Sequence, residues 1–264
     1  MGELNITVKD GIAEIRLNRP QRKNALSMEL FEALAEAGEA MKSQAGLRAV
    51  ILSGEGGDFC AGLDLTVMQS LAGRLDEMRD RLLNPPKGEA ANWFQKPCYV
   101  WQELDVPVIA AIDGVCLGGG MQLALAADFR IAHPDARLSI METKWGLIPD
   151  MGISQNLPKV MRADQAKELM MSARMFDGTE ALQMGLVTRL ADDPLSAARD
   201  MALELKAKSP EAVAGVKALV DRVWSMAPGD GLAVEAEIQA PIIGSTNQIE
   251  AVMANMQKRA PKFS

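Results

Sequence analysis

The first residues of the chain alternate between apolar and polar positions on both sides of a turn signal. The segments "LNITV" and "IAEIRL" are separated by Asp10 and Gly11, and this pattern predicts a β-hairpin with one buried face. A polar loop, "RPQRKNALS", ends in Ser27, a residue type that caps helix N-termini. An apolar stripe at helical spacing predicts a helix after Ser27. The stripe is formed by Met28, Phe31, Leu34, Ala35 and Met41.

Two buried strands farther along the chain each run into a loop of small residues. The strand "LRAVILSG" is followed by "EGGDFCAGLD", and "VPVIAAIDG" is followed by "VCLGGG" and the apolar helix "MQLALAADF". More strand is predicted in "RIAHPDARLSI", whereas residues 66–101 have the least regular pattern. From residue 151 onward the pattern is helical. Alternating strands and helices followed by helices alone predict a mixed α/β core with a helical C-terminal part.

Composition narrows the class of function. The 264 residues carry a formal net charge of −7, which argues against nucleic acid as the main partner because phosphate binding needs a clustered basic surface. No apolar run reaches the length of a membrane span, and the first residues lack a signal peptide's apolar region, so we expect no membrane association. Cys60, Cys98 and Cys116 show no paired spacing, which indicates a reduced, cytoplasmic setting. The single histidine, His133, precedes Pro134 at a strand exit, so we predict neither a metal site nor a catalytic histidine.

The two small-residue loops are candidates for binding an oxygen atom. A glycine-rich loop between a strand and a helix leaves backbone N–H groups unpaired, and Gly118, Gly119 and Gly120 allow a ligand to approach the backbone closely. One such loop is often only a tight turn. If the two loops converge, they form a two-donor hole for an enolate or oxyanion, in which each donor contributes roughly 3 to 4 kcal/mol in the transition state.

The segment "METKWGLIPDMG" places two carboxyl groups, Glu142 and Asp150, among mostly apolar residues. One interpretation is structural: Glu142 pairs with Lys144 in an extended segment, and Asp150 caps the helix that follows. The other is that the two acids transfer protons. The pKa separates these interpretations, because a capping aspartate has a lowered pKa whereas an acid in an apolar pocket has a raised one.

Four motifs occur together in one order and spacing: "LNRPQRKNALS", "FCAGLDL", "AIDGVCLGGGMQLALAADFRIA" and "WGLIPDMG". In these the chain resembles the crotonase (enoyl-CoA hydratase/isomerase) superfamily over essentially its whole length. The resemblance implies an α/β fold: a crotonase-type spiral of ββα turns in residues 1–200 and a helical oligomerisation region in residues 201–264. It also implies a homotrimer or a hexamer of paired trimers. The substrates are acyl-CoA thioesters, and no cofactor is required because coenzyme A is part of the substrate.

The same resemblance assigns roles to individual residues. The thioester oxygen is held by the backbone N–H groups of Leu63 and Gly119. Trp93, Phe94, Trp101 and Trp145 are expected to line the acyl pocket, although packing in the core or between subunits is an equal alternative. Lys258 and Lys262 are weaker candidates for contacts with a neighbouring subunit's ligand. The residues expected to contact coenzyme A are Arg22, Lys23, Ala25, Leu26, Ala61, Asp64 and Leu65.

The acids at the site indicate which reaction to expect. The hydratases of this superfamily use two glutamates, and this chain has Gln122 at the first position and Glu142 at the second. Glutamine orients water but accepts no proton at neutral pH. The dienoyl-CoA isomerases have a Glu and an Asp matching Glu142 and Asp150, although they too carry an acid at the first position. We therefore expect a double-bond isomerase with Glu142, Asp150 and Gln122 in its catalytic site. Hydration by Glu142 with a Gln122-positioned water, and a non-catalytic acyl-CoA binder, are the alternatives.

Overall fold

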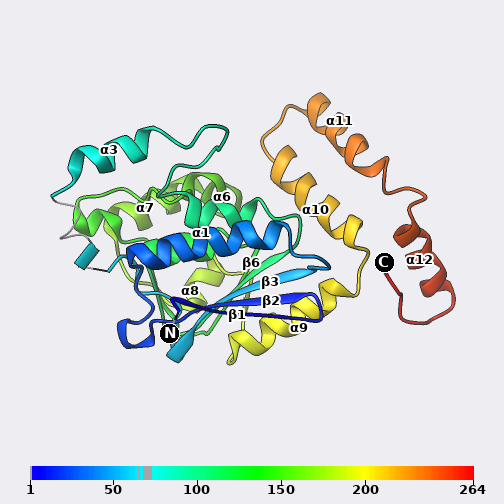
Figure 1. Cartoon of the computed structure of the whole chain (residues 1–264), viewed down its shortest axis with the longest axis horizontal. Helices are drawn as coiled ribbons and strands as arrows, with labels where there is room; N and C mark the ends of the chain where they lie inside the picture. Colours follow the sequence, from blue (N-terminus) through cyan, green and yellow to red (C-terminus); the bar gives the residue numbers. More distant parts are fainter. Residues whose placement is uncertain (1, 65, 68–72) are drawn as a thin grey trace.

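The computed structural model describes residues 2–64, 66–67 and 73–264. In this part of the chain a six-stranded sheet has the order β1-β2-β3-β4-β6-β8 (Figure 1). β1 and β2 pair antiparallel across Asp10 and Gly11, both with positive φ, which confirms the predicted hairpin. The other neighbours in the sheet are parallel. The strands are β1 Leu4–Lys9, β2 Ile12–Leu17, β3 Ala49–Gly54, β4 Val108–Ile112, β6 Phe129–Ala132 and β8 Arg189–Leu190.

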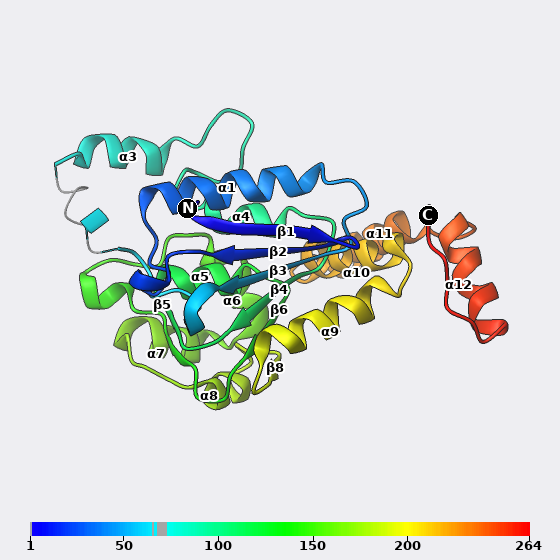
Figure 2. The same cartoon turned by 60° about the horizontal axis from the view of Figure 1, so that its bottom comes forward.

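Both faces of this sheet are covered, as the alternating side chains of β3 show. Val50 and Leu52 belong to a core shared with α1, α4 and α5, whereas Ala49 and Ile51 pack with α9 (Figure 2). This explains why β3 and β4 are apolar at nearly every position, as strands buried on both faces usually are. The helices around the sheet are α1 Met28–Lys42, α3 Leu75–Leu83, α4 Lys96–Gln102, α5 Gly119–Leu125, α6 Ile153–Val160, α7 Ala163–Ser172, α8 Gly178–Gln183 and α9 Pro194–Lys206.

A second, short sheet brings the glycine-rich segments together. It pairs β5 Val115–Leu117 with β7 Arg137–Ser139 in parallel, and an isolated bridge joins Cys60 to Cys116. The chain repeats one unit here, since β4 leads into β5 and α5, and β6 leads into β7 and the 3-10 helix η3 Glu142–Trp145. Residues of both units, among them Met121 of α5 and Leu138 of β7, belong to the same core cluster as the buried residues of α1.

Helix α1 begins and packs as its sequence predicts. The Ser27 hydroxyl accepts the Leu30 N–H at 3.2 Å, and Phe31, Leu34 and Met41 of the predicted stripe are buried. The helix lies so close to α4 that only glycine fits at position 38.

Replacing Gly38 with alanine is expected to destabilise the fold by about 1 to 3 kcal/mol, because the added Cβ would lie 2.4 Å from Cγ1 of Val100. The higher helix preference of alanine, about 1 kcal/mol, offsets only part of this cost. Denaturant unfolding measures the change. In a Val100→Ala background the same substitution should cost less; an equal cost in both backgrounds would argue against the contact.

The last helices extend away from the sheet. They are α10 Pro210–Val223, α11 Pro228–Gln239 and α12 Thr246–Met256 (Figure 1). α9 spans the domain boundary predicted at residue 200 and remains with the sheet. Lys217 of α10 is tied to the core by an ion pair with Asp128 at 2.8 Å. Among the described helices, none is long and apolar enough to cross a membrane.

Candidate active site

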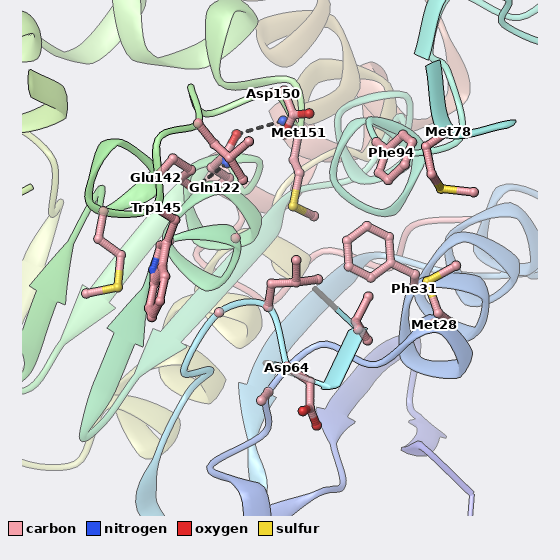
Figure 3. A pocket seen from close by; sticks show the side chains of 18 of the residues that line it. Met28, Phe31, Asp64, Met78, Phe94, Gln122, Glu142, Trp145, Asp150 and Met151 are labelled. Atoms are coloured by element: carbon pink, nitrogen blue, oxygen red, sulfur yellow. Dashed lines mark hydrogen bonds between the residues drawn. The ribbon is translucent and has the colours of Figure 1, made fainter. Parts of the chain in front are cut away.

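A cavity of about 750 Å³ lies between α1, α3, the N-terminus of α5 and the segment 141–151 (Figure 3). Its walls are mostly apolar. Trp93 stacks on Phe31 with ring centroids 5.3 Å apart, and Phe94 meets Trp93 edge-on at 5.0 Å. The apolar side chains that line it include Met28, Phe31, Leu75, Met78, Leu82, Trp93, Phe94, Met141, Trp145, Leu147, Ile148 and Met151.

The two small-residue loops converge at one wall of this cavity. The Cys60 N–H donates to the Val115 carbonyl and the Leu117 N–H donates to the Cys60 carbonyl, each at 2.9 Å. The approach requires glycine at position 120, where a Cβ would lie 2.5 Å from the Cys60 oxygen. A Cβ on Gly62, which has φ +89°, would lie 2.7 Å from the Leu117 oxygen. These contacts bring residues 61–64 against the start of α5.

Leu63 and Gly119 both line the cavity, and their backbone N–H groups have no acceptor among the described residues. Gly119 is the first residue of α5, so its N–H has no partner within the helix. The predicted pair of donors is therefore adjacent and unpaired. Two such donors stabilise a carbonyl oxygen that gains negative charge.

Glu142 and Asp150 also line the cavity, and neither structural alternative is present. Glu142 starts the 3-10 helix η3 rather than lying in an extended segment, and the Lys144 ammonium lies over the Trp145 ring at 5.6 Å. No ion pair of Glu142 occurs within the described ranges. α6 begins after Gly152 without a side-chain cap, so Asp150 does not cap it.

The pKa of each acid is raised, the direction expected of a proton-transfer group. Burial raises the pKa of Glu142, and the Asp150 carboxylate raises it further, while backbone N–H groups and the Gln122 amide oppose the rise. Partial burial also raises the pKa of Asp150. The Asp150 side chain is open to the cavity, so an acyl group that displaces water from the cavity would raise its pKa further.

Gln122 lies between these two acids and is almost fully buried, with 2% of its surface exposed. Its Nε2 donates to Glu142 Oε1 at 2.6 Å, and its Oε1 accepts the Met151 N–H at 2.8 Å (Figure 3). Glu142 Oε2 is buried and has no partner in the described part of the chain. Gln122 is thus engaged with protein at both ends of its amide.

Only some of the residues predicted to contact coenzyme A line the cavity; Lys23 and Leu26 do not. Arg22, Ala25, Ala61 and Asp64 line it. Leu65 lies outside the described residues.

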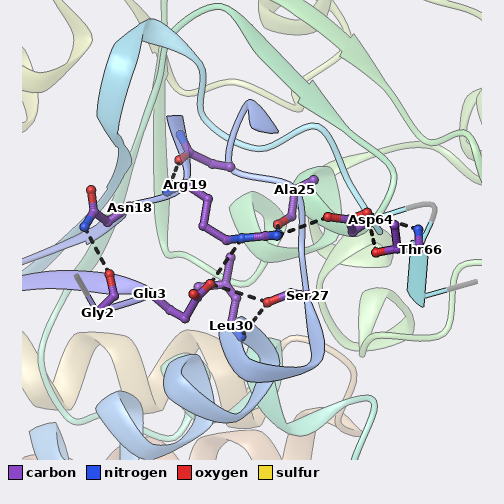
Figure 4. Close-up of polar contacts among 10 residues, drawn as sticks. Gly2, Glu3, Asn18, Arg19, Ala25, Ser27, Leu30, Asp64 and Thr66 are labelled. Atoms are coloured by element: carbon purple, nitrogen blue, oxygen red, sulfur yellow. Dashed lines mark hydrogen bonds and ion pairs between the residues drawn. The ribbon is translucent and has the colours of Figure 1, made fainter. Parts of the chain in front are cut away.

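Three of these residues also hold the loops in place. Lys23 pairs with Asp58 at 3.1 Å. Leu26 is fully buried, and its backbone accepts the Asp64 N–H at 3.0 Å. Asp64 pairs with Arg19 at 3.1 Å, and the backbone N–H of Thr66 helps to lower the Asp64 pKa (Figure 4).

Three of the four aromatic residues predicted to line the acyl pocket do line the cavity. Trp93, Phe94 and Trp145 line the cavity, but Trp101 is fully buried in the core and donates its indole N–H to the Pro97 carbonyl at 2.8 Å. The assignment of Trp101 to the acyl pocket is therefore corrected. Lys258 and Lys262 follow α12, which lies at the opposite end of the molecule from α3 (Figures 1 and 2).

Several lining residues were not predicted, among them Met28, Phe31, Met78 and Met151. The positions of Met28 and Phe31 could have been predicted from the sequence. The loop ending at Ala25 runs directly into α1, so the first turn of that helix must lie beside the same cavity.

Two carboxyl groups facing an apolar cavity beside a pair of free backbone donors define an acid–base enzyme that acts on a carbonyl compound. Residues 7–264 match the family model described as enoyl-CoA hydratase/isomerase. The chain belongs to that family.

Individual relatives cover nearly the whole chain. The mitochondrial methylglutaconyl-CoA hydratase of Mus musculus is 34% identical over 260 residues, 96% of this chain and 79% of its own length. The peroxisomal Δ(3,5)-Δ(2,4)-dienoyl-CoA isomerase of Arabidopsis thaliana is 33% identical, covering 94% of this chain and 91% of its own. An enoyl-CoA hydratase structure from Polaromonas sp. JS666 superposes with a TM-score of 0.89 at 29% identity and covers all of both chains. The predicted α/β fold of the crotonase type is confirmed.

Proposed function

We propose that this enzyme moves a carbon–carbon double bond in an enoyl-CoA or dienoyl-CoA thioester. The observation that carries the proposal is the pair of acids with raised pKa, Glu142 and Asp150, on the cavity wall beside the N–H groups of Leu63 and Gly119. The third polar position, Gln122, offers an amide that cannot act as a base at neutral pH.

In the proposed reaction the thioester oxygen accepts both N–H groups. One acid, in its carboxylate form, removes a proton from the α or γ carbon, and the electron pair moves into the carbonyl to form a dienolate. The negative charge rests on the oxygen between the two backbone donors. The other acid then donates a proton at a different carbon, so the product has the same atoms as the substrate. No cofactor takes part.

The acyl group is proposed to be an uncharged hydrocarbon. Among the described lining residues Arg22 is the only basic one, and it is exposed, whereas the inner walls carry aromatic, leucine and methionine side chains. A free carboxylate on the acyl chain would therefore lose its hydration without gaining a cationic partner, at a cost of several kcal/mol.

We accordingly expect kcat/KM for a thioester with a free carboxylate, such as a glutaconyl-type acyl group, to be at least about 100-fold below that for an uncharged acyl group of similar length. Steady-state kinetics with matched pairs of thioesters measures this ratio. Equal values would show that a cation reaches the acyl chain.

The C-terminal helices support a further proposal, assembly into a homotrimer or a pair of trimers. They expose large apolar side chains that a monomer would leave in water. Val216, Leu232 and Met256 in the helices, and Trp224 and Ile243 in the segments between them, are each more than 60% exposed. Light scattering coupled to gel filtration gives the mass of the assembly.

The reaction is tested by incubating the protein with 3-enoyl-, 3,5-dienoyl- and 2-enoyl-CoA while following thioester conjugation by absorbance and product mass. Isomerisation of the first two raises absorbance without a change of mass. Hydration of 2-enoyl-CoA lowers absorbance and adds one water. Hydration is the second candidate, favoured by the named activity of the Mus musculus relative. A protein that binds all three thioesters but changes none would be a non-catalytic binder, and the isomerase proposal would then be wrong.

A further inference from the structure

The orientation of the Gln122 amide is determined by its two partners. The Met151 N–H can only donate, so it must face the amide oxygen, and the amide nitrogen must then face the Glu142 carboxylate. A reversed amide would place two donors together at Met151 and two acceptors together at Glu142. The observed arrangement is the one in which both contacts are favourable.

This arrangement restricts each acid differently. Glu142 Oε1 is held by the amide, while Oε2 is buried and has no hydrogen-bond partner among the described residues. Met151 follows Asp150 directly, so its hydrogen bond to Gln122 fixes the backbone from which Asp150 projects. The Gln122 side chain on α5 therefore positions both the Glu142 carboxylate and the backbone next to Asp150.

We propose, building on the proposed isomerase function, that Gln122 is a positioning residue that orients Glu142 and the Asp150 backbone and does not hold a water molecule for addition to the double bond. Each end of the amide already has a protein partner, and because only 2% of the Gln122 surface is exposed, its second N–H and second lone pair are shielded from water in the cavity. The site is thereby arranged for proton transfer between carboxyl groups and substrate carbons.

A titration of Glu142 reports this role without any substrate. Burial is the main cause of the raised pKa of Glu142. The Asp150 carboxylate on the same segment also raises it, and hydrogen bonds from the Gln122 amide and from backbone N–H groups lower it. The nearby Cys98 thiol of α4 is buried, and its pKa is raised well above its usual value, so it stays neutral. Lys144 lies over Trp145 instead of pairing with Glu142. Removing the Gln122 donor should therefore raise the pKa of Glu142, since a hydrogen bond to the charged form lowers it.

The experiment compares Gln122→Met, which is similar in length but makes neither hydrogen bond, with Met121→Leu, a core change on the same helix that leaves the acids untouched. The Glu142 pKa is measured by NMR on protein with ¹³C-labelled glutamate side chains, with the signal assigned by its loss in Glu142→Gln. The pKa should rise in Gln122→Met and stay unchanged in Met121→Leu. Isomerase kcat should fall about 10- to 100-fold in Gln122→Met with little change in KM, since a hydrogen bond to a charged group is lost. The limb of its pH–rate profile that reports Glu142 should move to higher pH: the acidic limb if Glu142 is the base, and the basic limb if it is the acid.

Gln122→Glu serves as the second variant, because its carboxyl can still accept the Met151 N–H and so preserves the fold. Two adjacent carboxyl groups share a proton, so the pair should again titrate at higher pH. An unchanged Glu142 pKa in Gln122→Met would overturn the positioning role. Loss of hydration with retained isomerisation in that variant would show that Gln122 holds a water, which would also overturn it. Because the titration uses no substrate, a wild-type protein that is inactive on 3-enoyl- and 3,5-dienoyl-CoA would refute the isomerase function separately.

Discussion

Replacing Glu142 with glutamine is expected to lower kcat by about 10² to 10⁴, because the substitution removes one of the two proposed proton-transfer groups and keeps the size of the side chain. Binding of the thioester product should be retained, since the substitution keeps the size and shape of a side chain on the cavity wall. Isomerase kinetics and calorimetric titration with the product measure the two properties.

The matched control is Glu36→Gln, which makes the same chemical change on the exposed side of α1 and should leave kcat unaltered. Thermal unfolding separates lost chemistry from lost structure. The folded state raises the pKa of Glu142, so ionisation of this group costs stability as pH rises through that pKa. At pH 7.5 the glutamine variant should therefore be at least as stable as the wild type. Full activity in Glu142→Gln would remove this residue from the mechanism.

Replacing Gly119 with proline is expected to lower kcat by about 10² to 10³, the usual effect of losing one oxyanion donor. Proline has no backbone N–H, and the first position of a helix is where it is best tolerated. The change thus deletes the proposed donor at the site where it disturbs α5 least.

Gly119→Ala is the control for this substitution. It keeps the N–H and adds a Cβ that would lie 2.9 Å from Leu26 Cδ1 and 3.0 Å from Met151 Sδ, both near the ends of flexible side chains. The ratio of kcat between the alanine and proline variants measures the loss of the N–H group together with the effect of the proline ring carbon that replaces its hydrogen. Equal activity of the two variants would mean that the thioester oxygen lies elsewhere.

Features determined by local sequence were predictable. The Asp10–Gly11 turn needs two residues with positive φ, and Ser27 can satisfy the N-terminal N–H groups of a helix, so both patterns have few alternatives. The positions of the donors at Leu63 and Gly119 came instead from the family resemblance. Their convergence depends on the close contact of Gly120 with Cys60, which are 60 residues apart in the chain.

Other features depend on packing that sequence does not encode locally. Trp93 and Trp101 are both tryptophans and are near each other in sequence, but Trp101 is buried in the core whereas Trp93 lines the cavity. Their different locations depend on how α4 and the turn before it pack against α1. The role of Gln122 was equally hidden, because its partners Glu142 and Met151 are 20 and 29 residues away and only the fold brings them together.

The reactivity of the three cysteines can be used to measure local unfolding around the cavity. Cys60, Cys98 and Cys116 are unpaired and buried, and burial raises the pKa of Cys60 to about 12 and that of the other two well above the usual value. Only a thiolate reacts readily with an aromatic disulfide reagent. In the folded protein at neutral pH these buried, protonated thiols should therefore not react. The labelling rate therefore measures how often the interior around the cavity becomes accessible to solvent, and a bound thioester should slow it.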